Sequence, residues 1–106
     1  MSKVSEDIEL SVVVLCYHSE NIIEKFVEQL ISELTELNVI YELVLVANYD
    51  KNSDDNTPVL AAQLAQKYNC IKVLAHEKEG GMGWDMRSGL SAANGKYIAV
   101  IDGDAQ

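Results

Sequence analysis

The chain has 106 residues with 17 acidic and 8 basic side chains, which gives a formal net charge of −9 at pH 7. This length fits one domain, able to bury roughly 65% of the surface that the unfolded chain exposes. So negative a chain repels nucleic acid and anionic membrane surfaces unless basic residues cluster, and because no basic cluster is visible we exclude nucleic acid as a partner.

The sequence also lacks signals for export. No apolar stretch approaches the roughly 18 residues of a membrane-spanning helix. Residues 1–8 lack the apolar core of a signal peptide, so we expect a flexible lead-in there. Cys16 and Cys70 lie in apolar, strand-like runs without metal-ligand spacing, which is typical of reduced thiols. We therefore expect a cytoplasmic protein.

The first predicted elements are a strand and a helix. Residues 10–16 form a nearly continuous, β-branched apolar run, typical of a central parallel strand covered on both faces. Ser19 is a candidate helix cap. After it, apolar residues recur with helical spacing at Ile22, Ile23, Phe26, Val27, Leu30, Ile31, Leu34 and Leu37. The solvent-facing side of this predicted helix carries Glu20, Glu24, Glu28 and Glu36.

The rest of the chain continues this alternation. A strand over residues 43–47 is followed by a polar loop and by a helix that begins with Thr57 as cap and Pro58 as first helical residue. We then predict a strand over 71–76, a glycine-rich bend over 80–83, a helix over 84–93 and a strand over 97–101. Strands that alternate with helices at such spacings favour βαβ units and a parallel sheet.

The ending of the chain is its most informative motif. Asp102 and Asp104 follow an apolar strand, and alternate residues of an extended segment point to the same side. Two carboxylates so placed suit a hard divalent cation, and Gly103 lets a ligand approach the backbone. Open parallel sheets bind ligands beyond the carboxyl ends of their strands, which is where this motif lies. A strand that merely ends in a polar Asp-Gly turn is the alternative reading.

Four segments in order resemble the family 2 glycosyltransferases, whose nucleotide-sugar-binding half has the GT-A fold. Residues 12–20 resemble the family's first strand and its Pro-Thr-Tyr-Asn-Glu loop, and residues 42–46 the strand before its Asp-Asp-Gly-Ser loop. Residues 81–90 resemble the Gly-x-Gly segment with its helix, and residues 95–104 the strand into the Asp-x-Asp signature. With Gln106 the ending is similar to the Asp-x-Asp-x-Gln form of the polyprenyl-phosphate and dolichol-phosphate sugar transferases.

The resemblance implies an α/β fold, namely a Rossmann-like parallel sheet with strand order 3-2-1-4 and helices on both faces. It covers residues 9–106 as an incomplete GT-A domain, truncated after the Asp-x-Asp motif. The missing half of such an enzyme would carry the acceptor site and the catalytic base. We therefore assign no catalytic residue and expect this fragment alone to be inactive. Any membrane contact is expected only through the missing half. The strand over 97–101 would then leave an apolar sheet edge open to homo-oligomer formation.

The resemblance further implies the donor of a metal-dependent, inverting sugar transfer: a nucleoside-diphosphate sugar linked to UDP or GDP. Asp104 and Gln106 would bind Mg²⁺ or Mn²⁺, and Asp102 would bind the ribose or the same ion. The cation would offset the charge that builds on the leaving diphosphate.

The remaining donor contacts come from the same resemblance. Tyr17, with Leu15 and Cys16 behind it, would line the base and ribose pocket, and Arg87 matches an arginine beside the phosphates. The donor-binding set implied is Leu15, Cys16, Tyr17, Asn48, Gly83, Arg87, Asp102 and Gly103. The loop over residues 47–57 departs from the family, because it is longer and lacks the first carboxylate where the family has it. Asn48 stands near the position of the family's base-reading carboxylate.

Two other classes of protein stay open. The chain could be a non-catalytic α/β module that binds nucleotides or another protein, and titration with UDP and GDP in the presence of Mn²⁺ separates this from the first reading. A receiver-like domain also clusters carboxylates at strand ends. It needs an acidic pair after the first strand, which Tyr17 and His18 do not supply.

Overall fold

The computed structural model describes residues 8–17, 22–52 and 54–103, with the side chain of Met82 left undescribed. Four strands and three helices alternate along the chain: β1 (Leu10–Leu15), α1 (Ile23–Glu36), β2 (Tyr41–Val46), α2 (Thr57–Lys67), β3 (Ile71–Leu74), α3 (Met82–Ala92) and β4 (Tyr97–Asp102). Every strand pairing is parallel, and the strand order is β3-β2-β1-β4. The predicted α/β class and the 3-2-1-4 order are confirmed.

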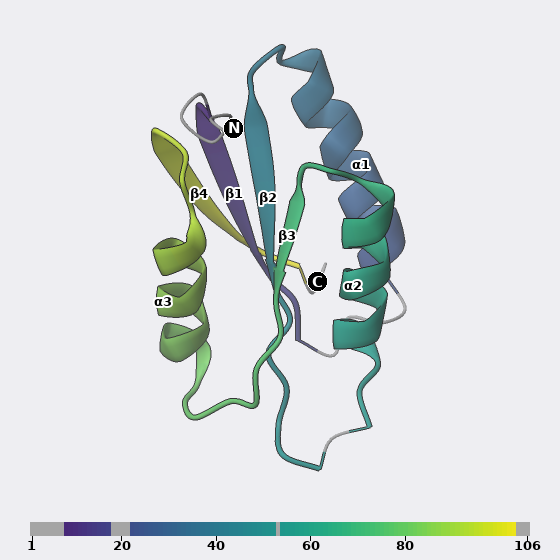
Figure 1. Ribbon diagram of the computed structural model, residues 1–106, viewed down its shortest axis with the longest axis vertical. Coiled ribbons are helices and arrows are strands. Elements are labelled where there is room, and N and C mark those ends of the chain that lie inside the picture. Colours follow the sequence, from purple (N-terminus) through teal and green to yellow (C-terminus); the bar gives the residue numbers. More distant parts are fainter. Residues whose placement is uncertain (1–7, 18–21, 53, 104–106) are drawn as a thin grey trace.

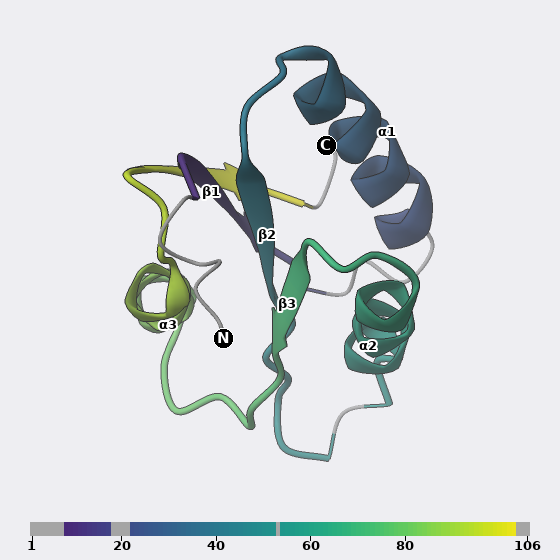
Figure 2. The ribbon, with the colours of Figure 1, turned by 45° about the horizontal axis from the view of Figure 1, so that its top comes forward.

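The helices form two layers around the sheet. Helices α1 and α2 lie together on one face, and α3 lies alone on the other (Figures 1 and 2). Helices on both faces were predicted, and the prediction is confirmed. Within the described ranges no helix is both long and apolar enough to cross a membrane, and the longest, α1, has 14 residues.

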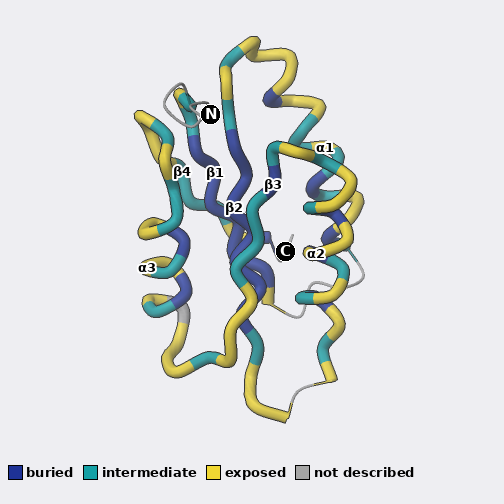
Figure 3. Tube along the Cα trace, in the orientation of Figure 1, coloured by how far each residue is buried: buried dark blue, intermediate teal, exposed yellow. Residues whose placement is uncertain are grey.

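The two central strands carry the core on both of their faces. In β1, Val12 and Val14 point toward α1 and α2, whereas Val13 and Leu15 point toward α3. Strand β2 alternates in the same way. The buried residues therefore concentrate in β1 and β2 (Figure 3), which explains why both strands read as unbroken apolar runs.

The helix starts differ from those predicted. Helix α1 begins at Ile23 with Ile22 in the N-cap position, so it does not begin at Ser19, which lies outside the described residues. Helix α2 begins one residue early, with Asn56 as N-cap and Thr57 as its first residue. The carboxylate of Asp55 serves as the cap instead, accepting the Thr57 backbone N–H at 3.0 Å and its hydroxyl at 2.6 Å.

Two further boundaries differ by two residues near the carboxyl edge of the sheet. Strand β3 ends at Leu74 instead of His76, because the His76 backbone N–H donates to the side chain of Asn48 at 2.9 Å and leaves the ladder. Helix α3 begins at Met82, two residues early. The Gly81 carbonyl already accepts the backbone N–H groups of Trp84 and Asp85, at 3.0 and 3.1 Å, which closes the first turn.

A buried polar cluster closes the opposite, amino-terminal edge of the sheet. Glu42 is only 5% exposed and accepts the Ser11 hydroxyl at 2.6 Å and the Asn94 backbone N–H at 2.7 Å. Lys72 lies 3.3 Å from the same carboxylate. Burial works against the charged form of Glu42, but these hydrogen bonds and the Lys72 charge outweigh it and lower its pKa. The cluster joins the loop after α3 to β1 and β2.

Nearby, residues before β1 pair with the segment that leads into β4. The backbone N–H of Lys96 donates to the Ile8 carbonyl at 3.1 Å, and that of Tyr97 donates to the Glu9 carbonyl at 2.9 Å. Ile8, the last residue of the expected lead-in, thus already takes part in the fold.

Candidate functional site

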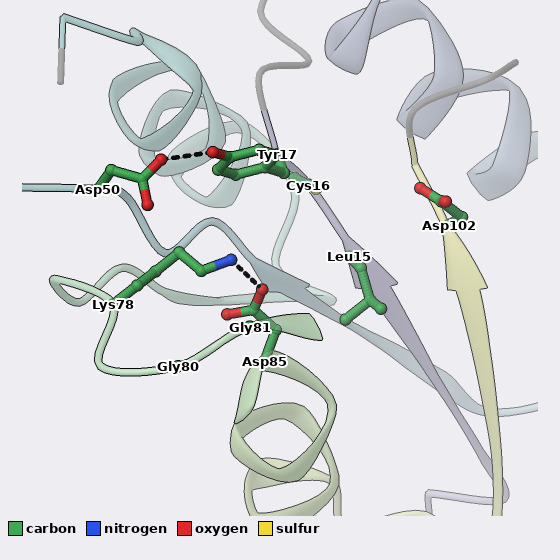
Figure 4. A pocket seen from close by; sticks show the side chains of 9 residues that line it. All are labelled: Leu15, Cys16, Tyr17, Asp50, Lys78, Gly80, Gly81, Asp85 and Asp102. Atoms are coloured by element: carbon green, nitrogen blue, oxygen red, sulfur yellow. Dashed lines mark hydrogen bonds and ion pairs between the residues drawn. The ribbon is translucent and has the colours of Figure 1, made fainter. Parts of the chain in front are cut away.

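The carboxyl ends of all four strands surround one pocket of about 380 Å³. The segments after β2 and β3 run alongside each other there, joined by a parallel bridge between Tyr49 and Glu77. The volume falls in the range typical of small-molecule sites. The pocket is lined by nine residues: Leu15, Cys16, Tyr17, Asp50, Lys78, Gly80, Gly81, Asp85 and Asp102 (Figure 4).

Tyr17 forms one side of the pocket and is linked to the loop after β2. Its side chain is 39% exposed, and its hydroxyl donates a hydrogen bond to the Asp50 carboxylate. That hydrogen bond, followed by partial desolvation and the negative charges of Asp50 and Asp55, raises the pKa of the Tyr17 phenol. Tyr17 therefore stays neutral and presents an aromatic face together with a fixed carboxylate.

Next to Tyr17 the pocket is lined by an ion pair between the loop after β3 and helix α3. The Lys78 ammonium lies 2.7 Å from Oδ2 of Asp85, and the two side chains are 12% and 11% exposed. The amide of Asn48 donates to Oδ1 of Asp85 at 3.0 Å. Lys78 also lies over the Tyr17 ring, with its ammonium 4.6 Å from the ring centre. Figure 4 shows both linked pairs, with Asp102 apart from them at the end of β4.

The structure brings four of the expected donor-binding residues together. Leu15, Cys16, Tyr17 and Asp102 all line the pocket. Leu15 and Cys16 contribute from the buried end of β1, whereas Asp102 is exposed at the tip of β4.

Two other expected residues, Asn48 and Gly103, form hydrogen bonds within the protein. Asn48 is 3% exposed, and its side chain bonds Asp85 and the His76 backbone, so it shapes the pocket wall without lining the pocket. Gly103 is buried against β1, where its N–H donates to the Leu15 carbonyl at 2.9 Å. A Cβ at Gly103 would lie 2.9 Å from Cγ1 of Val14, so close packing against β1 explains the glycine.

The last two expected donor contacts lie on α3. Gly83 and Arg87 are both exposed and stand outside the pocket lining. A Cβ at Gly83 would meet the Arg87 guanidinium at 3.7 Å, so Arg87 extends along the first turn of the helix.

Of the three predicted metal ligands, Asp102 alone belongs to the described part of the chain. Asp104 and Gln106 lie outside it. Among the described residues, no group of three His, Cys, Asp or Glu side chains is arranged to hold a metal ion. Asp102 has carboxylate oxygens, the type of ligand that Mg²⁺ and Mn²⁺ prefer, so its chemistry fits such an ion.

Sequence reasoning missed five lining residues: Asp50, Lys78, Gly80, Gly81 and Asp85. Asp50 and Lys78 occur in loops expected at the carboxyl edge, and the two glycines occur in the predicted bend. Asp85 had only a weak signal, as an acidic residue in the first turn of a helix, where the helix dipole favours it.

Comparison with known proteins assigns the chain to a family. Residues 11–106 match the model of Glycosyl transferase family 2. The chain belongs to this family. The resemblance inferred from four short segments is thereby confirmed, and the matched residues include all of β2, β3 and β4 and all of β1 except Leu10.

Several family 2 relatives are similar to nearly the whole chain. A beta-monoglucosyldiacylglycerol synthase of Trichormus variabilis is 34% identical over 92% of the chain and 20% of its own length. Glycosyltransferase GlyG of Streptococcus pneumoniae is 32% identical over 90% of the chain and 30% of its own length. A dodecaprenyl-phosphate galacturonate synthase of Rhizobium johnstonii is 28% identical over 95% of the chain and 29% of its own length. The chain thus spans 20% to 30% of these relatives.

Proposed function

We propose that this chain is the donor-binding part of a glycosyltransferase that uses a nucleoside-diphosphate sugar. The pocket at the carboxyl edge carries the proposal, because it combines an aromatic face, a carboxylate acceptor and an ammonium donor within about 380 Å³. Aromatic faces stack nucleobases, and paired donors and acceptors bind their polar edges. Tyr17, Leu15 and Cys16 bind the base and ribose in this proposal.

Asp50 is the residue we propose to accept a base N–H. Asn48, nearer the family position, has its side chain bonded inside the protein, whereas Asp50 lines the pocket. UDP and GDP both carry a base with a ring N–H beside a carbonyl. The proposal therefore includes both nucleotides and leaves their relative affinities to measurement.

A divalent cation, Mg²⁺ or Mn²⁺, forms part of the proposal. The described lining holds three carboxylates, Asp50, Asp85 and Asp102, against the ammonium of Lys78, so a diphosphate entering alone meets net negative charge. Asp102, Asp104 and Gln106 would hold the ion, which supplies positive charge next to the phosphates. Gly83 and Arg87 would approach the phosphates from α3.

The reaction proposed is a single displacement at the anomeric carbon. The bond from that carbon to the diphosphate oxygen breaks, and a bond to an acceptor oxygen forms on the opposite face, which inverts the configuration. The residues of this chain are assigned to donor binding, and none is assigned as the catalytic base. The acceptor, and any lipid character it has, stays outside the proposal.

Calorimetric titration tests the donor assignment. We expect UDP or GDP to bind with Mn²⁺ or Mg²⁺ and to bind much more weakly in EDTA. Asp102→Asn and Asp104→Ala should each remove the metal-dependent part of the binding. Glu36→Gln, at the far end of α1 and exposed, is the control with the same change of charge.

Two outcomes would favour the alternative of a non-catalytic module. Nucleotide binding that is indifferent to divalent ions and to Asp102 would leave a nucleotide binder without transferase chemistry. No binding of either nucleotide with any divalent ion would leave an interaction domain.

Self-association through β4 is a separate proposal about this chain. Among the described strands β4 pairs only with β1, and Tyr97 and Ile98 at its start are 62% and 43% exposed. An exposed apolar edge strand can pair with a second copy. Sedimentation at rising concentration should show dimers, and Ile98→Lys should reduce them. A wild-type chain that stays monomeric at high concentration contradicts this proposal.

A further inference from the structure

Lys78 is the one cation among the nine described residues that line the pocket, and it is already paired. Its ammonium lies 2.7 Å from Oδ2 of Asp85 at a position where both side chains are nearly buried. An ion pair so shielded from water is weakly screened by salt. Any anionic group that enters the pocket therefore meets an ammonium whose charge Asp85 already balances.

Asp85 is fixed in place, because each of its two carboxylate oxygens accepts a hydrogen bond from another side chain. Oδ1 accepts the Asn48 amide at 3.0 Å, and Oδ2 accepts Lys78. Asn48 is itself anchored by the His76 backbone N–H. Asp85 thus acts on a ligand through its charge and through Lys78.

Lys78, by contrast, faces space that a ligand can enter. An ammonium has three donors, and the hydrogen bond to Asp85 uses one of them. Gly80 and Gly81 line the pocket beside it, and a Cβ at Gly81 would meet nothing within 4 Å. Lys78 also lies over one face of the Tyr17 ring, so a ligand that contacts this tyrosine lies near the same ammonium.

We propose that Asp85 is a specificity-determining residue that acts as an internal counterion for Lys78 and so penalises phosphate groups that enter without a metal. The proposal rests on the donor-binding function proposed above and adds to it the source of the metal requirement. A neutral nucleoside is not repelled by the charge of Asp85 in this arrangement. A diphosphate is repelled by it and gains less from Lys78, unless a divalent ion neutralises the diphosphate.

The test compares UDP, GDP and the neutral nucleosides uridine and guanosine in calorimetric titrations, each with EDTA and with Mn²⁺. Asp85→Asn keeps the shape of the side chain and removes its charge. For whichever diphosphate the wild type binds, we expect this variant to bind at least about tenfold more tightly in EDTA, the effect of one unit charge within about 10 Å at an effective dielectric constant of about 20. The gain should shrink with Mn²⁺, and nucleoside binding should change less than twofold.

Two further variants test the role of Lys78 and control for the change in net charge. Lys78→Gln removes the cation and should weaken diphosphate binding, so the expected order of affinity is Asp85→Asn, wild type, Lys78→Gln. Glu79→Gln changes the net charge as Asp85→Asn does, but at an exposed neighbouring position. It should alter diphosphate affinity less than twofold. Circular dichroism of each variant confirms that it is folded before titration, and Lys78→Gln provides the test if Asp85→Asn unfolds.

The failing results can be told apart. If the wild type binds UDP or GDP but Asp85→Asn binds it no more tightly than Glu79→Gln does, the counterion inference is overturned and the proposed function stands. A gain for uridine or guanosine as large as that for its diphosphate also overturns the inference, because charge would then not be the cause. Lys78→Gln that binds the diphosphate as well as the wild type overturns it too. If the wild type binds neither nucleotide, the proposed function fails and takes this inference with it.

Discussion

Gly89 lets α3 approach the sheet, and replacing it by alanine should loosen that contact. A Cβ at Gly89 would lie 2.3 Å from Cγ1 of Val13 and 3.0 Å from Cγ2 of Val46. Carbon atoms in good contact are about 3.5 to 4.0 Å apart. The added methyl group therefore penetrates Val13 by more than about 1 Å, and either the helix or the valine must move.

The size of the effect follows from two opposing terms. Overpacking of a core costs about 1 to 3 kcal/mol. Replacing glycine inside a helix by alanine returns up to about 1 kcal/mol through helix propensity. Gly83→Ala, in the same helix but exposed and with only the Arg87 guanidinium at 3.7 Å, should show the second term alone.

Urea unfolding followed by circular dichroism measures both variants. We expect Gly89→Ala to be less stable than Gly83→Ala by about 1 to 3 kcal/mol, which for a domain of this size lowers the melting temperature by about 4 to 8 °C per kcal/mol. Val13→Ala removes the overlapping methyl group, so combining it with Gly89→Ala should cost less than the sum of the two. Equal midpoints for the Gly89 and Gly83 variants, or strict additivity with Val13→Ala, would refute the packing argument.

Three other predictions concern polar groups. Glu42→Gln should destabilise the chain at pH 7. The folded-state pKa of Glu42 lies below its ordinary value of 4.5, so the Glu42 carboxylate contributes fully to stability above pH 4.5, and this contribution is lost as the pH falls through the folded-state pKa. The difference in free energy of unfolding between wild type and variant, measured with urea, should therefore decrease below pH 4.5. A difference that does not change with pH would contradict this. Asn48→Ala removes one of the two hydrogen bonds to Asp85 and leaves the His76 backbone N–H without its Asn48 acceptor, so we expect a loss of stability of about 1 to 3 kcal/mol by thermal unfolding; an unchanged melting temperature would contradict this. Asp55→Ala removes the cap of α2 and should cost about 1 kcal/mol in the same assay, with exposed Asp54→Ala as the control that should cost less.

Local pattern was sufficient to predict the architecture. The apolar runs of β1 and β2, the helical spacing of apolar residues from Ile22 to Leu37 and the glycine-rich bend together predicted alternating strands and helices, and so a parallel sheet. Burial on both faces requires an unbroken apolar run, and a helix packed on one face requires the 3.6-residue period, so each signal follows directly from the packing it serves. The family could be inferred as well, because four short segments occur in the right order.

Boundaries and the inner wall of the site depended on long-range contacts. Strand β3 stops where the side chain of Asn48, 28 residues away in the chain, replaces a backbone partner. The pairing of Lys78 with Asp85 joins a loop to a helix, and its anchor at Asn48 lies 37 residues from Asp85 in the chain. Such contacts leave no periodic trace in the sequence.

By itself the sequence determined which segments are strands and helices, that the sheet is parallel, and that the polar loops gather at its carboxyl edge, because these follow from periodicity and from the handedness of βαβ connections. The tertiary structure alone decided which polar side chains face the pocket and which bond inside the protein. The reason is that one amide such as Asn48 can serve either purpose, and its partners choose between them only after the loops after β2 and β3 and helix α3 have come together.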